Sequence, residues 1–244
     1  MTQQTLFLIL PALLPAFQLL FGSPACSGPD RTLEDRRYYV ACYDAGRKLS
    51  AWVSYHLDAQ HLIPLAARPS GFRRDSQLAS GAATNLDYKG SGFDRAHYAP
   101  ARDFSWDDDA IRSTFSLINA APLRPNVNRG RLAQLEAAVR RLASEFDSLT
   151  VITGVLFDDT DPQFIGSGRV AVPAQVFKVI LAIRGSSKVM FAYLVPNRVS
   201  IAEPVSHFAT TVDEVERLTN LDFFSELEDS EECALESQRR VLDP

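Results

Sequence analysis

The chain has 244 residues, of which 46% are hydrophobic, and it contains 12 glycines and 14 prolines. This composition is typical of a folded protein with a buried core and excludes a chain that is disordered throughout. The formal net charge is −5, which excludes binding of nucleic acid through an overall basic surface. Any polyanion must therefore be held by a local group of cationic side chains.

The N-terminal segment, residues 1–25, contains no charged side chain and has an apolar core of the length found in signal peptides. Pro11 and Pro15 interrupt this core, and it is shorter than the ~20 residues that a membrane span requires. We predict export (secreted or periplasmic), cleavage after Ala25, a single domain over 26–244, and no stable membrane contact once the leader is removed. Because basic residues are missing from the leader, an uncleaved membrane anchor and a mitochondrial address stay open.

The three cysteines allow at most one disulfide within the chain. Cys26 and Cys233 lie near the two ends of the expected domain, and our hypothesis pairs them in an oxidising compartment. Cys42, within an apolar run, is then expected to be a buried thiol. The spacing of the cysteines and histidines is not that of a structural zinc site.

The first predicted elements are two strands, 38–44 and 50–57, which are rich in aromatic and β-branched residues. Residues 60–110 lack clear periodicity, and loops of that length in a compact domain are usually functional or disordered. From Arg131 onward apolar residues recur at steps of three and four, which predicts a helix with one buried face.

The remaining predicted elements lie in the C-terminal half. Three apolar runs are typical of core strands, and a helix with Thr210 or Thr211 as its N-cap should follow them. The chain should end in an acidic tail that includes residues 225–233. The three strands and the helix are predicted at 150–157, 176–183, 189–196 and 211–219.

The segment "SGFDRAHYAP" (91–100) places Asp94, Arg95 and His97 within four positions. An imidazole can accept a proton from water near neutral pH, and a guanidinium can hold a phosphate. A charged turn without chemical function fits these residues equally well. The other histidines lack a neighbouring carboxylate motif and are expected to be structural or surface residues: His56, His61 and His207.

Asn128 and Glu136 stand at the beginning of the helix predicted from Arg131. An asparagine there is commonly an N-cap, so capping is one interpretation of Asn128. Glu136 falls at the margin of the apolar stripe and should be half-buried. A carboxylate in that position needs a partner, such as a hydrated cation or an arginine.

Two segments, "GSGFDRAHYAPARDF" and "STFSLINAAPLRPNVNRGRLAQLE", resemble the DNA/RNA non-specific endonuclease family, the ββα-metal or His-Me-finger nucleases. The family motif Asp-Arg-Gly-His is matched by Asp94–His97, except that Ala96 replaces the glycine. Asn119, Asn128 and Glu136 match the asparagines and the glutamate that follow it in the family. The resemblance covers roughly residues 38–227.

The resemblance implies an α+β fold: a ββα-metal nuclease with a central, mostly antiparallel sheet flanked by helices. The ββα unit would consist of the strand and loop ending at His97, a strand at 114–118, and the helix from Arg131. A methyl group at Ala96 would strain the backbone if this position required a positive φ.

The resemblance also implies the roles of the site residues. His97 would be the general base, and Asn128 would bind Mg²⁺, for which Mn²⁺ could substitute. Glu136 would orient the water molecules of the metal, and Asn119 would position either the His97 loop or the hydrated metal. Arg95 would neutralise charge on the phosphate, and Asp94 would pair with a nearby arginine.

The resemblance further implies a second phosphate-binding arginine, which in the family lies a few residues ahead of a Phe-x-x-Asp pattern that Phe72 and Asp75 match. Arg68, Arg73 and Arg74 compete for this role, and the spacing favours Arg68.

The expected activity is hydrolysis of DNA and RNA, contacted through their phosphate backbones with weak sequence preference. Two alternatives remain: a nuclease-like phosphate- or partner-binding module impaired by Ala96, and a phosphodiesterase acting on a non-polymeric substrate. Whether the chain forms a homodimer is left open.

Overall fold

A computed structural model of the protein describes residues 22–78, 82–198 and 202–242. The predicted leader lies outside these ranges except for its last four residues, 22–25. In the described ranges, no helix is both long enough and apolar enough to cross a membrane.

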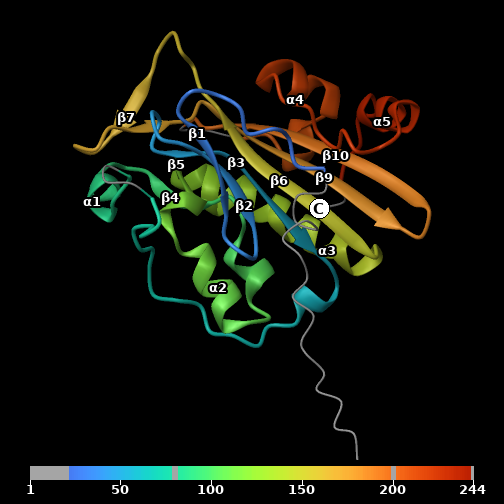
Figure 1. Cartoon of the computed structure of the whole chain (residues 1–244), viewed down its shortest axis with the longest axis horizontal. Helices are drawn as coiled ribbons and strands as arrows, with labels where there is room; N and C mark the ends of the chain where they lie inside the picture. The colour runs from blue at the N-terminus through green and yellow to red at the C-terminus, as the bar shows by residue number, and fades with distance from the viewer. Residues whose placement is uncertain (1–21, 79–81, 199–201, 243–244) are drawn as a thin grey trace, which may run out of the picture.

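A seven-stranded sheet forms the centre of the molecule, with neighbouring strands antiparallel throughout (Figure 1). The predictions at 38–44, 50–57, 150–157, 176–183 and 189–196 are confirmed as five of its strands. In spatial order the strands are β1 (Arg31–Asp35), β2 (Val40–Asp44), β3 (Leu49–Leu57), β6 (Ser148–Leu156), β9 (Gln175–Arg184), β10 (Ser187–Pro196) and β11 (Ala209–Thr210).

The middle strands have nearly continuous apolar sequences because both faces of the sheet are covered. Successive residues of β9 point to opposite faces: Ile180 and Ala182 join the larger core, whereas Val179 and Leu181 join the smaller one. The sheet therefore separates two hydrophobic cores, and each must be closed by helices or loops.

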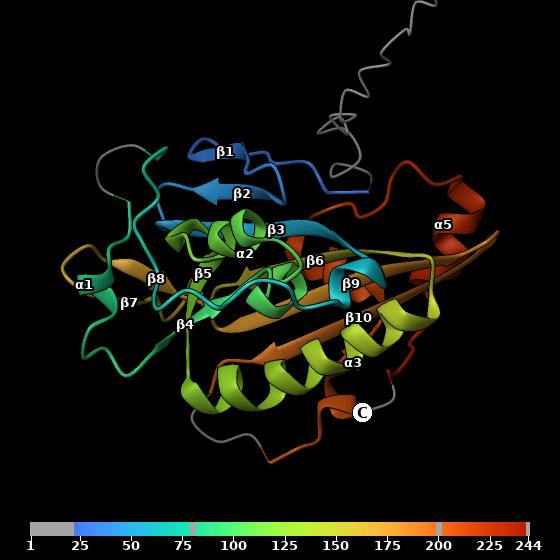
Figure 2. The same ribbon diagram turned by 90° about the horizontal axis from the view of Figure 1, so that it is seen from below.

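Helices cover the two faces differently. α2 (Asp108–Thr114) and α3 (Ala133–Glu145) pack into the larger core, and Figure 2 shows α3 running across the sheet. α4 (Val212–Thr219) and α5 (Asp229–Glu236) close the smaller core beside β10 (Figure 1). The expected α+β fold with a central antiparallel sheet is confirmed.

The last predicted helix is confirmed as α4. Thr211 is its N-cap, and the Thr211 hydroxyl accepts a hydrogen bond from the Glu214 backbone N–H at 3.1 Å. The acidic tail is partly helical because it contains α5.

A two-stranded ribbon lies outside the main sheet, formed by β4 (Asp94–His97) and β5 (Ala120–Leu123). The strand predicted at 114–118 is wrong. Thr114 ends α2, where its hydroxyl donates to the Ile111 carbonyl, and Leu117–Asn119 form a 3₁₀ turn. A short apolar run that is buried on all sides does not distinguish a strand from a helical turn.

The helix predicted from Arg131 begins earlier than expected. Val127–Leu132 form a π-helical turn that continues directly into α3. Short elements that the sequence pattern did not indicate complete the described part of the fold: the turn α1 (Asn85–Tyr88) and the hairpin of β7 (Gln163–Ile165) and β8 (Val170–Val172).

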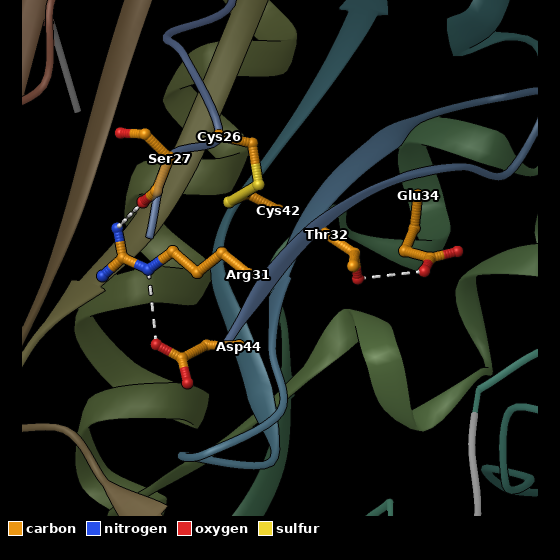
Figure 3. The surroundings of a disulfide bond; sticks show 7 residues. All are labelled: Cys26, Ser27, Arg31, Thr32, Glu34, Cys42 and Asp44. Carbon is orange, nitrogen blue, oxygen red and sulfur yellow. Dashed lines mark hydrogen bonds and ion pairs between the residues drawn. A yellow bond between two sulfur atoms is a disulfide. The ribbon is translucent and has the colours of Figure 1, made fainter. Parts of the chain in front are cut away.

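The disulfide joins Cys26 to Cys42, and Cys233 is a free, exposed thiol on α5. Both the predicted Cys26–Cys233 bridge and the predicted buried thiol at Cys42 are therefore wrong. The segment before β1 runs back along β2, which brings the Cα atoms of Cys26 and Cys42 to 5.4 Å (Figure 3). Arg31 supports this turn by donating to the Ser27 carbonyl and to the Asp44 carboxylate.

Loss of the disulfide should destabilise the fold. It closes a loop between residues 16 apart in sequence, for which the restriction of the unfolded chain is worth about 3 kcal/mol. We expect Cys26→Ser to lower the free energy of unfolding in urea by about that amount, and Cys233→Ser to leave it nearly unchanged. Equal effects of the two substitutions, or peptide mapping that links Cys233, would contradict the observed pairing.

Candidate active site

His97 is the last residue of β4 and pairs with Ala120 of β5. Side chains two residues apart on a strand share a face, so Arg95 and His97 lie on the same side of the ribbon. Ala96 points to the other side, where it is buried in the larger core. The ribbon thus presents a guanidinium and an imidazole together.

Two aromatic rings enclose the His97 imidazole. Its ring centroid is 4.5 Å from that of Phe72 and 5.0 Å from that of Phe115. The Arg68 guanidinium carbon lies 5.0 Å from the Phe115 centroid, so a positive charge stands beside the same aromatic wall.

The Nε2 atom of His97 is buried and has no hydrogen-bond partner among the described residues. Burial lowers the pKa of His97 to about 3, and the positive charge of Arg68 contributes to the lowering. The imidazole is therefore neutral over the whole range near neutral pH, with an unoccupied ring nitrogen.

Asn119 secures the loop that follows His97. Its side chain is fully buried, with Oδ1 accepting from the Ala99 N–H at 2.9 Å and Nδ2 donating to the carbonyls of Ala99 at 2.9 Å and Thr114 at 3.0 Å. The backbone carbonyl of Asn119 also accepts from the Tyr98 N–H. The Asn119 amide thus holds together the backbone on both sides of the connection between β4 and β5.

Asn128 lies inside the π-helical turn and is not an N-cap. Its Nδ2 donates to the Asp94 carboxylate at 2.9 Å, and Arg129 donates two hydrogen bonds to the same carboxylate at 2.6 and 2.7 Å. Burial alone would raise the pKa of Asp94, but the hydrogen bonds from Arg129 and Asn128 lower it. The predicted pairing of Asp94 with a nearby arginine is confirmed.

Glu136 is half-buried in the first turn of α3, as expected. Burial raises its pKa to about 7, against the opposing effect of positive charges led by Lys178. Arg68 is among these charges, so the electrostatic influence of Arg68 reaches both His97 and Glu136. The structure thus brings three of the predicted site residues into one neighbourhood.

A buried polar network continues beneath Glu136. Asp103 accepts from Arg140 at 2.9 Å and from the Tyr55 hydroxyl at 2.8 Å, and Lys178 donates to the Thr153 hydroxyl. The sequence patterns did not predict this network. A lysine inside the apolar run "VFKVILAI" was the signal that could have indicated it, because a lysine buried in a core strand requires polar partners.

Among the three upstream arginines, the structure favours Arg68. Arg68 is exposed and its charge reaches His97. The backbone of Arg73 forms hydrogen bonds with the backbones of Phe115 and Leu117. The positive charge of Arg74 lowers the pKa of Tyr43, against the larger effect of burial.

The Phe-x-x-Asp pattern has a structural explanation. Phe72 contacts the His97 ring, whereas Asp75 is buried and accepts hydrogen bonds from Arg36 and Ser116. Arg95 stands over the Tyr88 ring, with its guanidinium carbon 5.6 Å from the centroid.

Ala96 does not have the conformation that would disfavour a methyl group. It lies in β4 opposite Ala121, and it is not among the described residues with positive φ. Its side chain is 1% exposed. The premise that Ala96 strains the backbone is therefore wrong, and Ala96→Gly is not expected to activate the protein by relieving strain.

Two of the other histidines, His56 and His61, lie beside a carboxylate that the sequence pattern did not indicate. Asp58 lies 3.3 Å from His56 Nε2 and 3.4 Å from His61 Nδ1, so these two histidines do have a carboxylate neighbour. Their ligand atoms lie within 4.8 Å of one another, a spacing that could hold a metal ion. His61 Nδ1 already accepts the Asp58 backbone N–H, and His207 packs against Phe208.

A surface hollow of about 450 Å³ lies along α3, and no predicted site residue lines it. The residues of the hollow are Arg131, Gln134, Ala137, Arg141, Ala202, Pro204, Val205 and Ser206.

The antiparallel strands β4, which ends in His97, and β5 are followed by a helix that carries Asn128 in its first turn, and this arrangement is that of a nuclease of the ββα type. The sequence matches the DNA/RNA non-specific endonuclease family over residues 21–230, and the chain belongs to this family of enzymes.

Known relatives agree with this membership. Bovine mitochondrial endonuclease G is 35% identical over 230 residues, covering 83% of this chain and 75% of the relative. Nuclease C1 of Cunninghamella echinulata var. echinulata is 34% identical over 225 residues, covering 86% and 88%. The solved structure of the EndoG/EndoGI complex contains a chain that superimposes with a TM-score of 0.79 at 30% identity, covering 89% of this chain and 94% of that one.

The pKa of His97 can be tested directly. We expect the imidazole of the cation-free protein to stay neutral well below pH 6.5 in an NMR titration, because burial and the Arg68 charge both disfavour the protonated ring. Arg68→Gln should raise this pKa part of the way toward its ordinary value. Arg73→Gln, a matched change on the same loop, should leave it unchanged. Titration of His97 near 6.5 in the unmodified protein would contradict the assignment.

Proposed function

We propose that this protein is a Mg²⁺-dependent endonuclease that hydrolyses phosphodiester bonds in both DNA and RNA, with Mn²⁺ able to replace Mg²⁺ and with His97 as the general base. The single observation that carries the proposal is the shielded, unpartnered Nε2 of a neutral His97 beside two phosphate-binding candidates. The membership in the DNA/RNA non-specific endonuclease family supports it.

His97 would remove a proton from the water molecule that attacks the phosphorus atom. A base must be unprotonated and must have a free lone pair, and His97 meets both conditions near neutral pH. A pKa this low also makes the ring a weak base, and the negative charge of a bound phosphate would raise the pKa toward the range that general-base catalysis needs. The walls formed by Phe72 and Phe115 restrict the ring to one orientation. General-base catalysis of this kind contributes roughly 10²–10⁴ in rate.

Arg95 and Arg68 would hold the phosphate. Arg95 shares the His97 side of the ribbon, and Arg68 is exposed next to Phe115. A guanidinium can donate two hydrogen bonds to one phosphate, which fixes both its position and its charge. Since neither arginine reads a base edge in this arrangement, weak sequence preference is expected.

The donor set fits a magnesium ion at Asn128. Because Nδ2 of Asn128 donates to Asp94, its Oδ1 is directed away from Asp94 and accepts no hydrogen bond from the described residues. An amide oxygen is a suitable ligand for Mg²⁺, which retains several water molecules. Asn128 would hold the ion directly and Glu136 through water. Bound there, Mg²⁺ would supply positive charge that stabilises the phosphate in the transition state.

Asn119 would act as a positioning residue. Its hydrogen bonds to Ala99 fix the backbone directly after His97. The hydrogen bond from Asn128 to Asp94 fixes the start of β4 relative to Asn128. These contacts would hold the base and the metal ligand at a constant separation, while the exposed Arg68 would stay free to adapt to a polymer.

Export remains part of the proposal. The Cys26–Cys42 disulfide supports an oxidising compartment, and cleavage after Ala25 would leave both cysteines in the mature chain, residues 26–244. The alternative location is the mitochondrion, because two of the relatives are mitochondrial endonucleases. A homodimer stays open.

The alternative functions are weaker. The impaired-module alternative depended on strain at Ala96, and that residue is in a regular strand. The small-diester alternative has no support from the hollow along α3, which none of the predicted site residues lines. Comparing Mg²⁺-dependent digestion of plasmid DNA and long RNA with that of a small diester separates the remaining possibilities, since a polymer nuclease should prefer the polymers.

Substitution of the base should affect turnover. We expect His97→Ala to lower kcat on plasmid DNA by roughly 10²–10⁴ with little change in DNA affinity, because the ring is assigned to proton transfer and not to phosphate binding. His207→Ala is the matched control and should retain full activity. Unchanged Mg²⁺-dependent cleavage by His97→Ala would refute the general-base role.

Substitution of the metal ligand gives a second test. Asn128→Ala should abolish cleavage at Mg²⁺ concentrations that saturate the unmodified enzyme. The loss of its hydrogen bond to Asp94 should lower stability by only about 1 kcal/mol. Asn126→Ala, in the neighbouring exposed position, should keep the normal Mg²⁺ dependence. If Asn128→Ala cleaved DNA with the same half-activating Mg²⁺ concentration, the ligand assignment would be wrong.

A further inference from the structure

The smaller core, on the face of the sheet opposite α3, is closed by two helices with carboxylates directed toward each other. Asp213 and Glu216 are separated by three positions on α4 and share one side of that helix. Glu236 stands in the last turn of α5, and Figure 1 shows α5 beside α4. One oxygen of each of these three carboxylates lies within 4.8 Å of the other two.

Glu236 is the unusual member of this carboxylate cluster (Asp213, Glu216 and Glu236). It is only 7% exposed, and its Oε1 has no hydrogen-bond partner in the described structure. Glu232, one helical turn earlier on α5, also has a buried Oε1 without a described partner. Native proteins pair nearly all buried polar atoms, so two unpaired carboxylate oxygens at one place indicate a missing partner.

Basic side chains of the described structure do not supply that partner. The cluster residues and Glu232 form no ion pair with a described lysine or arginine. Nearby cations are engaged elsewhere: Arg217 pairs with Glu214, and Lys188 pairs with Glu231. Like charges one turn apart on a helix destabilise it, and a buried carboxylate without a counter-charge is costly. An inorganic cation would remove both penalties.

The chain holds at least one of these carboxylates in a fixed place. Oε1 of Glu216 accepts the Phe223 backbone N–H at 2.8 Å. Phe223 and Phe224 are themselves fully buried in the smaller core. Glu216 therefore sits on a rigid support, with its second oxygen available.

We propose that the carboxylate cluster is a binding site for a divalent cation of the Ca²⁺ type, which joins α5 to α4. Ca²⁺ takes six to eight oxygen ligands in a flexible geometry, whereas Mg²⁺ demands a near-ideal octahedron and retains several water molecules. Three carboxylates from two helices, with oxygens within 4.8 Å of one another, therefore suit Ca²⁺. The site is separate from the His97 site because the sheet lies between them, and its role is structural.

Calcium binding to the chelator-treated full chain tests the proposal. We expect isothermal titration with CaCl₂ to show one site with a Kd on the order of 10⁻⁴–10⁻³ M, the range of extracellular calcium modules, and thermal unfolding to shift upward as Ca²⁺ is added. Carrying out the same titration in Asn128→Ala removes any contribution from the His97 site. The calcium site should persist in that variant.

Variants of the cluster identify the ligands. Glu236→Gln keeps the side-chain volume and should weaken Ca²⁺ binding at least ~10-fold, the loss expected for removing a charged metal contact. Asp213→Asn, at an exposed position that tolerates substitution, should weaken it as well. Glu226→Gln is the matched control, since Glu226 is exposed on the same acidic segment outside the cluster. It should bind Ca²⁺ normally.

Two results would overturn the proposal: no binding or thermal shift with Ca²⁺ up to 10-fold above the expected range, or unchanged binding by both Glu236→Gln and Asp213→Asn. In EDTA, Glu236→Gln should be at least as stable as the unmodified protein, because the substitution removes charge repulsion. This measurement shows that weak binding by the variant does not result from unfolding.

Discussion

The reciprocal hydrogen bonds between the buried Asn119 amide and the backbone of Ala99 are the constraint on which the site depends. They close the long connection between β4 and β5 at its base, and so fix the register in which His97 faces Ala120. Without that register, Ala96 and His97 would exchange faces, because one step along a strand reverses the direction of a side chain. A neutral amide can fulfil this role at any pH, since it does not titrate.

Burial acts on the two titratable residues of the site in opposite senses. The same water-poor surroundings that keep His97 neutral also resist the ionised form of Glu136. Arg68 opposes protonation of the histidine and favours the ionised form of the carboxylate, so one exposed guanidinium lowers the pKa of both groups. The buried Lys178 supports the carboxylate from below.

The sequence pattern was sufficient for those parts of the fold in which local composition and burial agree. Long apolar runs predicted the central strands, and the threonine before α4 predicted its cap. The failures have tertiary causes. The run at 114–118 packs against β3, where Ser50 donates to the Ile118 carbonyl. The pairing of Cys26 depends on where the chain turns before β1. For the site, the resemblance supplied the candidate residues. The aromatic enclosure of His97 and the partner of Asn128 could not be predicted, because they depend on segments distant in sequence.

The hydrogen bond between the Gly22 carbonyl and the Phe224 N–H links the two ends of the described chain. Phe224 holds a left-handed backbone conformation with φ of 60° in the connection from α4 to α5, and such a residue depends on its surroundings to stay there. Cleavage after Ala25 would remove the carbonyl that it contacts. Removal of the leader would then weaken the contact that holds the connection from α4 to α5. Proteolysis near the N-terminus would in this way lower the local stability of the C-terminal helices.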